Sequence, residues 1–209
     1  MKRRNFLKTT AAATAGSALF SGQALAQQNQ NYTTTDLTIE SWDGIELAAT
    51  VFEPKSEGSH PAMLMTHGWG GSRSMAQSTA SMYANNGYVV LTYDSRGFGN
   101  SGGLVRLDGP KEQKDASRLI DWLANRDSVE TEGENNPRVG MDGVSYAGGI
   151  QLLTAARDQR LDAVVPRITW HTLKYSLGPN DAIKIGWLTL LFFSGGASSR
   201  LSGELGKGL

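Results

Sequence analysis

Near the start of the chain, apolar and polar residues alternate in two adjoining runs within residues 36–53, DLTIESWDGIELAATVFE. Alternation with a period of two is typical of a half-buried β-strand. Asp43 and Gly44 separate the runs and suit the positive φ angles of a tight hairpin turn. The pattern predicts an antiparallel pair of strands that opens a sheet.

Short continuous apolar runs then follow at residues 61–66 (PAMLMT) and 88–93 (YVVLTY), and both predict buried parallel strands. The segment between them repeats small and aromatic residues at helical spacing: Ala76, Thr79, Ala80 and Tyr83. Asn86 and Gly87 predict where this helix ends. The unit is strand, helix, strand.

The same alternation continues to about residue 166. Pro110 begins a helix with an apolar face of Ala116, Leu119, Ile120 and Leu123. A polar loop at 130–137 precedes a strand at 138–142, a helix after Gly148 with Leu152, Leu153 and Ala156 on its apolar face, and a strand at 163–166. The order predicts an α/β fold, a mainly parallel sheet with helices on both faces, and ligand chemistry at the carboxyl ends of the strands.

Composition narrows the classes of function. The 209 residues are 39% hydrophobic and 19% charged, which fits one globular domain. Basic and acidic residues both number 20, so no basic field favours a nucleic-acid partner. Cysteine is absent, which excludes disulfides and a cysteine nucleophile. Residues 70–73 (GGSR) lack the Gly-Lys-Ser/Thr of a nucleotide-binding loop, and no spacing of metal ligands stands out, so we expect no cofactor and no metal.

The first residues, MKRRNFLKTTAAATAGSALFSGQALAQQ, resemble a twin-arginine export signal. A basic start with Arg3 and Arg4 precedes a weakly apolar stretch and the small-x-small pattern that ends at Ala26. We therefore expect a signal over residues 1–26, a polar disordered lead-in over 27–35, and a periplasmic or extracellular location.

The motif that carries chemistry is Gly143-Val144-Ser145-Tyr146-Ala147-Gly148-Gly149, directly after a predicted strand. A serine on a sharp strand-to-helix turn needs small residues two positions before and after it, and Gly143 and Ala147 meet that need. Such a turn exposes the serine hydroxyl and places backbone N–H groups at a helix N-terminus, where they stabilise a developing oxyanion.

Two further loops carry a family resemblance, HGWGG at 67–71 and DSRGFGNSGG at 94–103. With the serine motif, their order from the hairpin to about Trp170 resembles the α/β-hydrolase superfamily. RVGMDGVSYAGG resembles its X-prolyl dipeptidyl-peptidase and cocaine-esterase-like branch. The resemblance implies Ser145 as nucleophile, backbone N–H groups of Tyr146 and Trp69 as oxyanion hole, and an ester, small amide or short peptide as substrate. Trp69 replaces the tyrosine that the dipeptidase-like branch often has, and Ala147 replaces a common glycine, so esterase and peptidase both stay open.

The catalytic acid and histidine are harder to place, since family triads run in the order serine, acid, histidine. His60 and His67 precede Ser145, and His171 alone follows it, two strands earlier than the family places its histidine. Asp181 is a weaker candidate for the acid. We therefore expect a fold truncated before its last strands, which leaves an apolar edge. Three alternatives remain: a truncated hydrolase, an inactive remnant that binds a partner, and a fold completed by a second chain.

The remaining segments have structural interpretations. Residues 36–169 are the predicted hydrolase core, and 170–209 the start of an incomplete helical cap. The apolar stretch 183–193 contains Lys184 and is too short for a stable membrane span. We expect His67 to be structural, Asp94 and Arg96 to tie the loop after the fourth strand together through a charge-assisted hydrogen bond, and Ser101 to be an ordinary loop residue.

Overall fold

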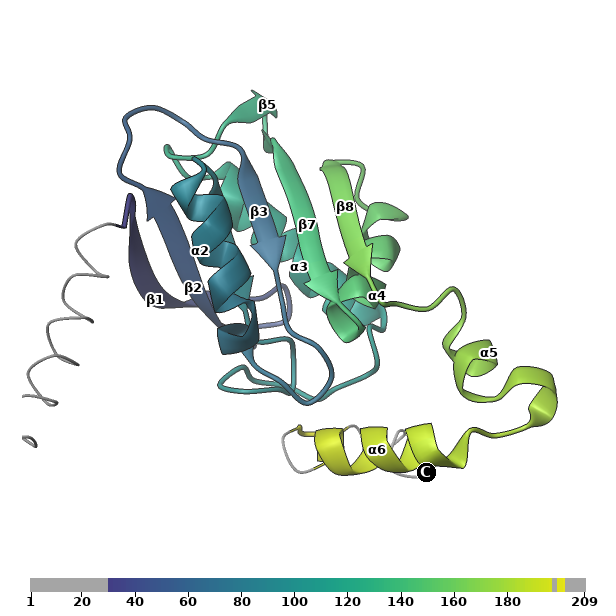
Figure 1. Cartoon of the computed structure of the whole chain (residues 1–209). Coiled ribbons are helices and arrows are strands. Elements are labelled where there is room, and N and C mark those ends of the chain that lie inside the picture. The colour runs from purple at the N-terminus through teal and green to yellow at the C-terminus, as the bar shows by residue number, and fades with distance from the viewer. Residues whose placement is uncertain (1–29, 197–198, 202–209) are drawn as a thin grey trace, which may run out of the picture. The chain divides into compact units, whose positions relative to one another are not determined.

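The computed structural model describes residues 30–196 and 199–201, so the predicted signal over 1–26 lies outside the described residues. A six-stranded sheet has the order β1-β2-β4-β3-β7-β8 (Figure 1). The strands are β1 (Tyr32–Glu40), β2 (Glu46–Pro54), β3 (Ala62–Met65), β4 (Val89–Tyr93), β7 (Val139–Val144) and β8 (Leu161–Arg167). The pairs β1–β2 and β2–β4 are antiparallel and the other three are parallel, which confirms the mainly parallel sheet.

The predicted hairpin forms with its turn at the expected place, where Gly44 has a φ of 80°. The first strand begins earlier than predicted, because Tyr32 pairs with Pro54 at its start. The Tyr32 ring lies 5.7 Å from that of Phe52, and its hydroxyl donates to Ser81 Oγ at 2.9 Å. The prediction of a disordered lead-in is therefore wrong for residues 32–35, which β2 orders by pairing along its whole length.

Helices cover both faces of the sheet, as predicted. On one face, α2 (Gln77–Asn85), preceded by the short helix η1 (Arg73–Ala76), packs small residues such as Ala80 against β3 and β4. On the other face lies α3 (Pro110–Ala124), and its four predicted apolar residues are all fully buried. The sheet therefore has a core on each side.

Helix α4 (Tyr146–Ala155) differs from the prediction in its buried face. Leu152 and Leu153, the expected core residues, are 41% and 38% exposed. The helix begins directly after Ser145, and the turn fixes its rotation so that another face is buried: Ala147, Ile150, Gln151 and Thr154, at helical spacing. The sharp turn, rather than side-chain hydrophobicity, determines which face of α4 meets the sheet.

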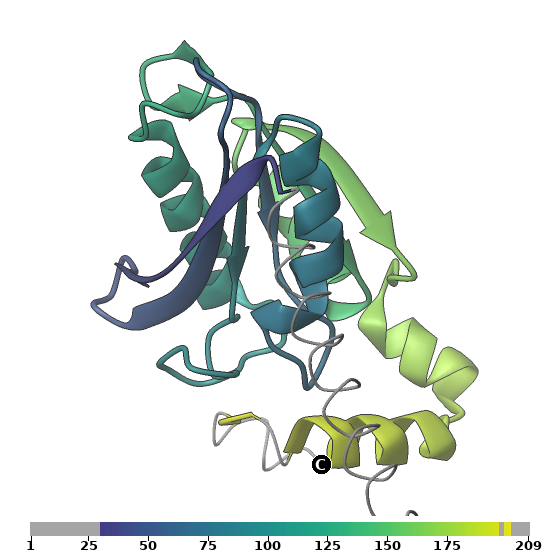
Figure 2. The same cartoon turned by 60° about the vertical axis from the view of Figure 1, so that its left-hand side comes forward.

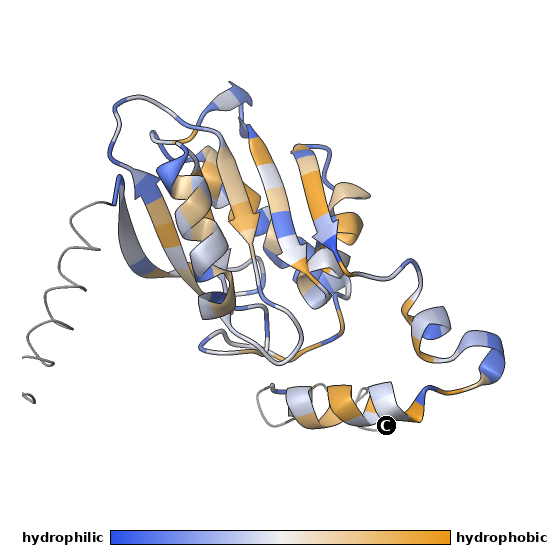
Figure 3. Ribbon diagram, in the orientation of Figure 1, coloured by the Kyte–Doolittle hydropathy of each residue, from blue (hydrophilic) through white to orange (hydrophobic). Residues whose placement is uncertain are grey.

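The remaining elements are short. The polar loop at 130–137 holds a small hairpin of β5 (Thr131–Gly133) and β6 (Asn136–Pro137). After β8 the chain forms α5 (Leu173–Leu177), η2 (Pro179–Asp181) and α6 (Ile185–Gly196). Helix α6 crosses the end of the sheet where β3, β7 and β8 end (Figures 1 and 2), and it is apolar (Figure 3). None of the helices that the structure describes combines the length and the hydropathy that a membrane span requires.

Candidate active site

Ser145 lies between the end of β7 and the start of α4, with φ 59° and ψ −115°. A residue other than glycine rarely adopts a positive φ, and such a backbone conformation costs about 1–3 kcal/mol. The surroundings hold it: the Ser145 N–H donates to Arg167 O at 2.8 Å, and its carbonyl accepts from Gly148 N–H at 2.8 Å. The backbone is therefore the strained turn that the motif predicts, and the serine is half-buried.

Close contacts explain the small residues around this turn. A Cβ on Gly143 would lie 2.5 Å from the Ala147 Cβ, so glycine is required at 143 when alanine stands at 147. A Cβ on Gly148 would lie 2.8 Å from the Thr169 Cβ, and one on Gly149 would lie 2.7 Å from the ring of Trp170. Alanine fits at position 147 because Gly143 has no Cβ that would clash with it.

Thr169 is a residue of this site that the sequence analysis did not identify. Its hydroxyl donates to the carbonyl of Ser145 at 3.2 Å, which adds a tie from the segment after β8 to the turn. The sequence signal that could have identified it is its position two residues after β8, the strand that pairs with β7.

The side chain of Tyr146 points into the protein and not toward the serine. It is fully buried, its ring packs 5.6 Å from Phe98, and its hydroxyl accepts the Asp108 N–H at 3.2 Å. Burial, followed by the nearby carboxylates of Asp108 and Glu112, raises the pKa of this phenol well above its usual value. What Tyr146 can offer the site is its backbone N–H at the first position of α4.

The loop at 67–71 lies against the turn, since a Cβ on Gly68 would be 3.8 Å from Val144 O. The ring of Trp69 packs edge-on against Tyr146 at 5.5 Å, and its Nε1–H donates to Leu191 O of α6 at 2.7 Å. Among the hydrogen bonds of the described residues, neither the Trp69 nor the Tyr146 backbone N–H has an acceptor. Both predicted oxyanion donors thus lie in segments that contact each other.

His67 has the geometry of a structural residue. It is buried, its Nε2 accepts the Ser95 N–H at 3.0 Å, and its Nδ1 lies 2.8 Å from Gly68 O. Since a nitrogen that accepts carries no proton, Nδ1 is the protonated nitrogen. Burial lowers the pKa of this imidazole and outweighs the hydrogen bond to Gly68 and the charge of Asp94.

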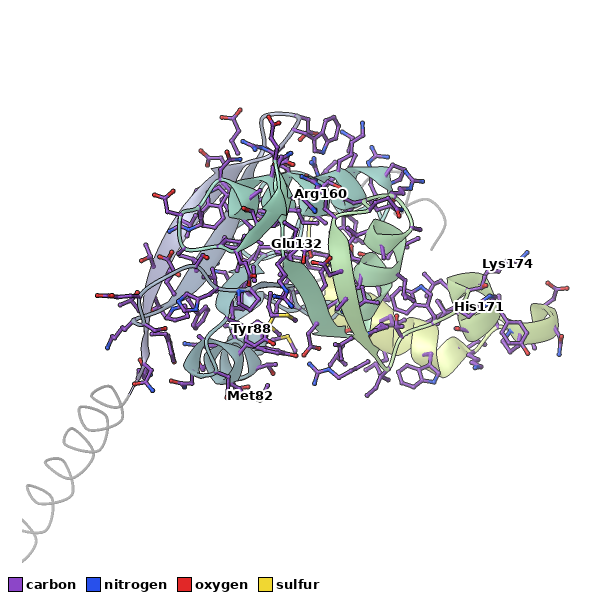
Figure 4. All side chains as sticks on the ribbon, turned by 90° about the horizontal axis from the view of Figure 1, so that it is seen from above. Met82, Tyr88, Glu132, Arg160, His171 and Lys174 are labelled. Carbon is purple, nitrogen blue, oxygen red and sulfur yellow. The ribbon has the colours of Figure 1, made fainter. Side chains whose placement is uncertain are left out.

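The other two histidines make hydrogen bonds to residues other than Ser145. His171 is exposed just before α5, its Nδ1 is 2.9 Å from Thr172 Oγ1, and Figure 4 shows it near Lys174 beside the α5 segment. His60 contacts Ser56. Asp181 is exposed at the end of η2. In the described part of the chain, no histidine hydrogen-bonds to the Ser145 hydroxyl.

Asp94 and Arg96 form ion pairs, but with partners outside their own loop. Asp94 Oδ2 lies 2.7 Å from Arg73 Nη1, and Arg96 Nη2 lies 2.6 Å from Asp115 Oδ1 and 2.9 Å from Asp43 Oδ1. Asp94 Oδ2 also accepts the Asn100 N–H at 2.9 Å, so the expected charge-assisted tie within the loop is confirmed for Asp94. For Arg96 it is wrong, because its ion-pair partners lie in α3 and the hairpin turn. Ser101 is a buried loop residue, as expected, and its hydroxyl donates to Asp94 O at 2.5 Å.

Residues that could hold a metal do not gather at this site. Across residues 30–196 and 199–201, no group of three or more His, Cys, Asp or Glu side chains is placed to ligate a metal ion.

A mainly parallel sheet with a strained serine between an interior strand, β7, and the helix that follows it defines the α/β-hydrolase class of fold. The X-Pro dipeptidyl-peptidase (S15) family matches residues 43–197, and the chain belongs to this family. It is therefore a member of a hydrolase family. Residues 1–20 match the signal sequence of the twin-arginine translocation pathway, so the protein is exported to the periplasm or beyond.

Three similar proteins illustrate the match. The quorum-quenching protein AidA of Acinetobacter baumannii is 31% identical over 161 residues, which cover 74% of this chain and 51% of AidA. The structure of the hypothetical protein PA2218 of Pseudomonas aeruginosa matches with a TM-score of 0.64 and 27% identity, over 77% of this chain and 50% of that one. A CocE/NonD family hydrolase of Staphylococcus aureus matches with a TM-score of 0.63 and 20% identity, over 84% and 36%. The chain spans about half the length of these relatives or less.

Proposed function

We propose that the chain is a serine hydrolase of esters or small amides and peptides that acts through an acyl-enzyme on Ser145. The observation that carries the proposal is the backbone of Ser145, whose φ of 59° persists between β7 and α4 under close contacts on both sides. Strain of this size is retained where the surroundings enforce it, and it is characteristic of functional turns.

In the proposed reaction Ser145 Oγ bonds to the substrate carbonyl carbon and gives its proton to a general base. The carbonyl oxygen becomes an oxyanion, and the backbone N–H groups of Tyr146 and Trp69 donate to it. The bond to the alcohol or amine breaks, and the leaving group takes the proton. In the second half, water attacks the acyl carbon and gives its proton to the base. The bond to Ser145 Oγ then breaks, Ser145 takes the proton back, and the carboxylic acid is released.

The general base has two candidate sources. His171 follows Ser145 in the chain, but its contact is Thr172. We propose two sources to distinguish by experiment: His171 after a rearrangement of the segment between β8 and α5, or a histidine from a second polypeptide that also supplies the acid.

The test is labelling with a fluorophosphonate probe, which reacts with activated serines. We expect one label on the protein, at Ser145 by peptide mapping, and none on Ser145→Ala. Ser78→Ala, at an exposed serine of α2, is the matched control and should label like the parent. A folded parent protein that stays unlabelled would overturn the proposal.

His171→Ala identifies the base. If His171 is the base, labelling should slow by roughly 10³-fold or more. An unchanged rate assigns the base to another group.

A second candidate function is a binding module without turnover. It is favoured by the absence of any hydrogen bond between Ser145 and a histidine among the described residues. Hydrolysis of p-nitrophenyl acetate separates the two: turnover that Ser145→Ala abolishes supports the hydrolase, whereas a folded parent at the rate of Ser145→Ala supports the binding module.

A further inference from the structure

A pocket of about 580 Å³ lies beside the hairpin, between the strands β1, β2 and β4 and the helices η1 and α2. It is lined by residues such as Asp36, Thr50, Arg73 and Asn100, and none of Ser145, Tyr146 or Trp69 borders it. Its volume falls within the roughly 300–1,000 Å³ of small-molecule sites. The pocket is therefore separate from the candidate active site.

The sheet supplies a polar wall. Asp36 pairs with Thr50, and Thr50 pairs with Thr92, so these three side chains form one row on the same face of the sheet. Thr50 Oγ1 donates to Asp36 Oδ1 at 2.5 Å and accepts from Arg73 Nε at 3.0 Å. The row is therefore fixed in position, as a preformed binding wall requires.

The charged groups that line the pocket are one guanidinium and two carboxylates, which pair with each other and leave a net charge of −1. Arg73 Nη1 lies 2.7 Å from Asp94 Oδ2, and its Nη2 lies 3.7 Å from Asp36 Oδ1. The buried Asp94 also accepts from the backbone N–H groups of Arg73 at 2.6 Å and Asn100 at 2.9 Å. A bound anion would meet two carboxylates, and a bound cation would have to compete with Arg73 for both of them, so a neutral ligand fits the pocket better than either.

Three polar side chains of the pocket have no hydrogen-bond partner among the described residues. The side chains of Thr34, Gln77 and Asn100 line the pocket, and in the described part of the chain none of the three makes a side-chain hydrogen bond. A carboxamide offers both donors and an acceptor, and a hydroxyl offers both as well. An apolar ligand would leave these groups unsatisfied, at a cost.

We infer that this pocket binds a neutral polyhydroxylated ligand, such as a short saccharide. Neighbouring hydroxyls of a sugar each donate and accept, which matches the carboxamides of Gln77 and Asn100 and the hydroxyls of the sheet. The inference does not depend on hydrolysis at Ser145, because the lining residues belong to other segments.

The test is titration of the 209-residue chain with maltotriose, cellotriose, xylotriose and chitotriose, followed by NMR of side-chain N–H groups. We expect at least one trisaccharide to shift the amides of Gln77 and Asn100 and the Nε–H of Arg73, with a Kd of about 1 mM or tighter. Asn100→Ala removes an exposed amide but keeps the backbone N–H that holds Asp94, so it should weaken binding roughly fivefold without loss of fold.

The matched control is Gln159→Ala, at an exposed amide outside the pocket, which should leave the affinity unchanged. The inference is overturned if none of the four trisaccharides shifts these signals at roughly 20 mM. It is also overturned if sodium phosphate shifts the Arg73 Nε–H while the sugars do not, or if Gln159→Ala weakens binding as much as Asn100→Ala.

Discussion

The two edge strands of the sheet differ in chemistry. The edge strand β1 pairs with β2 over nine residues, and its exposed side chains are all polar: Thr33, Thr34, Thr35, Asp36, Thr38 and Glu40. The opposite edge strand, β8, exposes the apolar Ala163 and Val165 (42%) beside the charged Asp162 and Arg167. Leu152 and Leu153 of the adjacent α4 are exposed to a degree similar to Val165. No described strand pairs with the outer side of β8.

This difference shows what each edge requires. Charged and hydroxyl side chains let an edge strand remain in water, whereas a parallel strand rich in valine is typical of the interior of a sheet. Exposed apolar groups beside an unpaired strand favour association with another element. The part of the molecule from β1 to β7 is stabilised by its own packing, and the β8 side presents a surface suited to a covering partner.

The largest predicted effect compares one arginine–aspartate pair from each part. The side chains of Arg96 and Asp115 are 2% and 1% exposed, and those of Arg167 and Asp142 are 45% and 5% exposed. Burial by itself would lower the pKa of Arg96, but hydrogen bonds to Asp115 and Asp43 outweigh it and raise the pKa. Arg96→Ala should lower the free energy of unfolding by about 3–5 kcal/mol, because it leaves the buried carboxylate of Asp115 without its cation.

Arg167→Ala is the matched variant on the β8 side. It should cost about 1 kcal/mol, since its guanidinium is partly in water and Tyr83 still donates to Asp142 Oδ2 at 3.2 Å. Urea denaturation of both variants gives the comparison. Equal losses would show that the two parts are stabilised to the same degree.

The sequence predicted elements where the signal is local. The hairpin follows from alternation around Asp43 and Gly44, and α3 from the helical spacing of its apolar residues. The ion-pair partners of Asp94 and Arg96 could not be predicted in this way, because Arg73 lies 21 residues from Asp94, and Asp43 and Asp115 lie 53 and 19 residues from Arg96. Ion pairs between residues so far apart in the chain produce no local sequence pattern.

In the candidate site, too, the part encoded by neighbouring residues could be predicted and the part made by distant residues could not. The turn at Ser145 depends on Gly143 and Ala147, close neighbours in the chain, and was predicted with the correct backbone. Thr169 approaches from beyond β8, so its contact depends on how β7 and β8 pair. The buried face of α4 was predicted wrongly, because the spacing of apolar residues gives the period of a helix, whereas the turn before α4 fixes its rotation.

A middle-sized effect concerns Asp108, where the loop after β4 meets α4. Its carboxyl is buried, and burial, followed by the charge of Glu112, raises its pKa well above the usual value. A raised pKa means that the folded protein keeps a proton that the unfolded chain loses above about pH 4. The contribution of Asp108 to the free energy of unfolding is therefore fully present at low pH and is lost as the pH rises toward the pKa of the folded state.

Asp108→Asn should remove this part of the pH dependence and stabilise the protein by about 1–2 kcal/mol near pH 7. Asparagine also tolerates the φ of 56° at this position. Urea midpoints between pH 4 and 8 measure the slope, and Asp127→Asn, at an exposed site, should not change it. If Asp108→Asn falls in stability with pH as steeply as the parent, this carboxyl does not control the slope.

The smallest effect on stability tests the two edges directly. Val165→Lys places a charge on the exposed face of β8 and should change the free energy of unfolding by less than about 0.5 kcal/mol. Because a lysine on an edge strand opposes pairing with another edge, it should reduce self-association at high protein concentration, measured by sedimentation velocity. Thr35→Lys on the polar edge β1 should leave association unchanged. If both substitutions reduce association equally, or the parent is strictly monomeric, the apolar edge of β8 does not drive it.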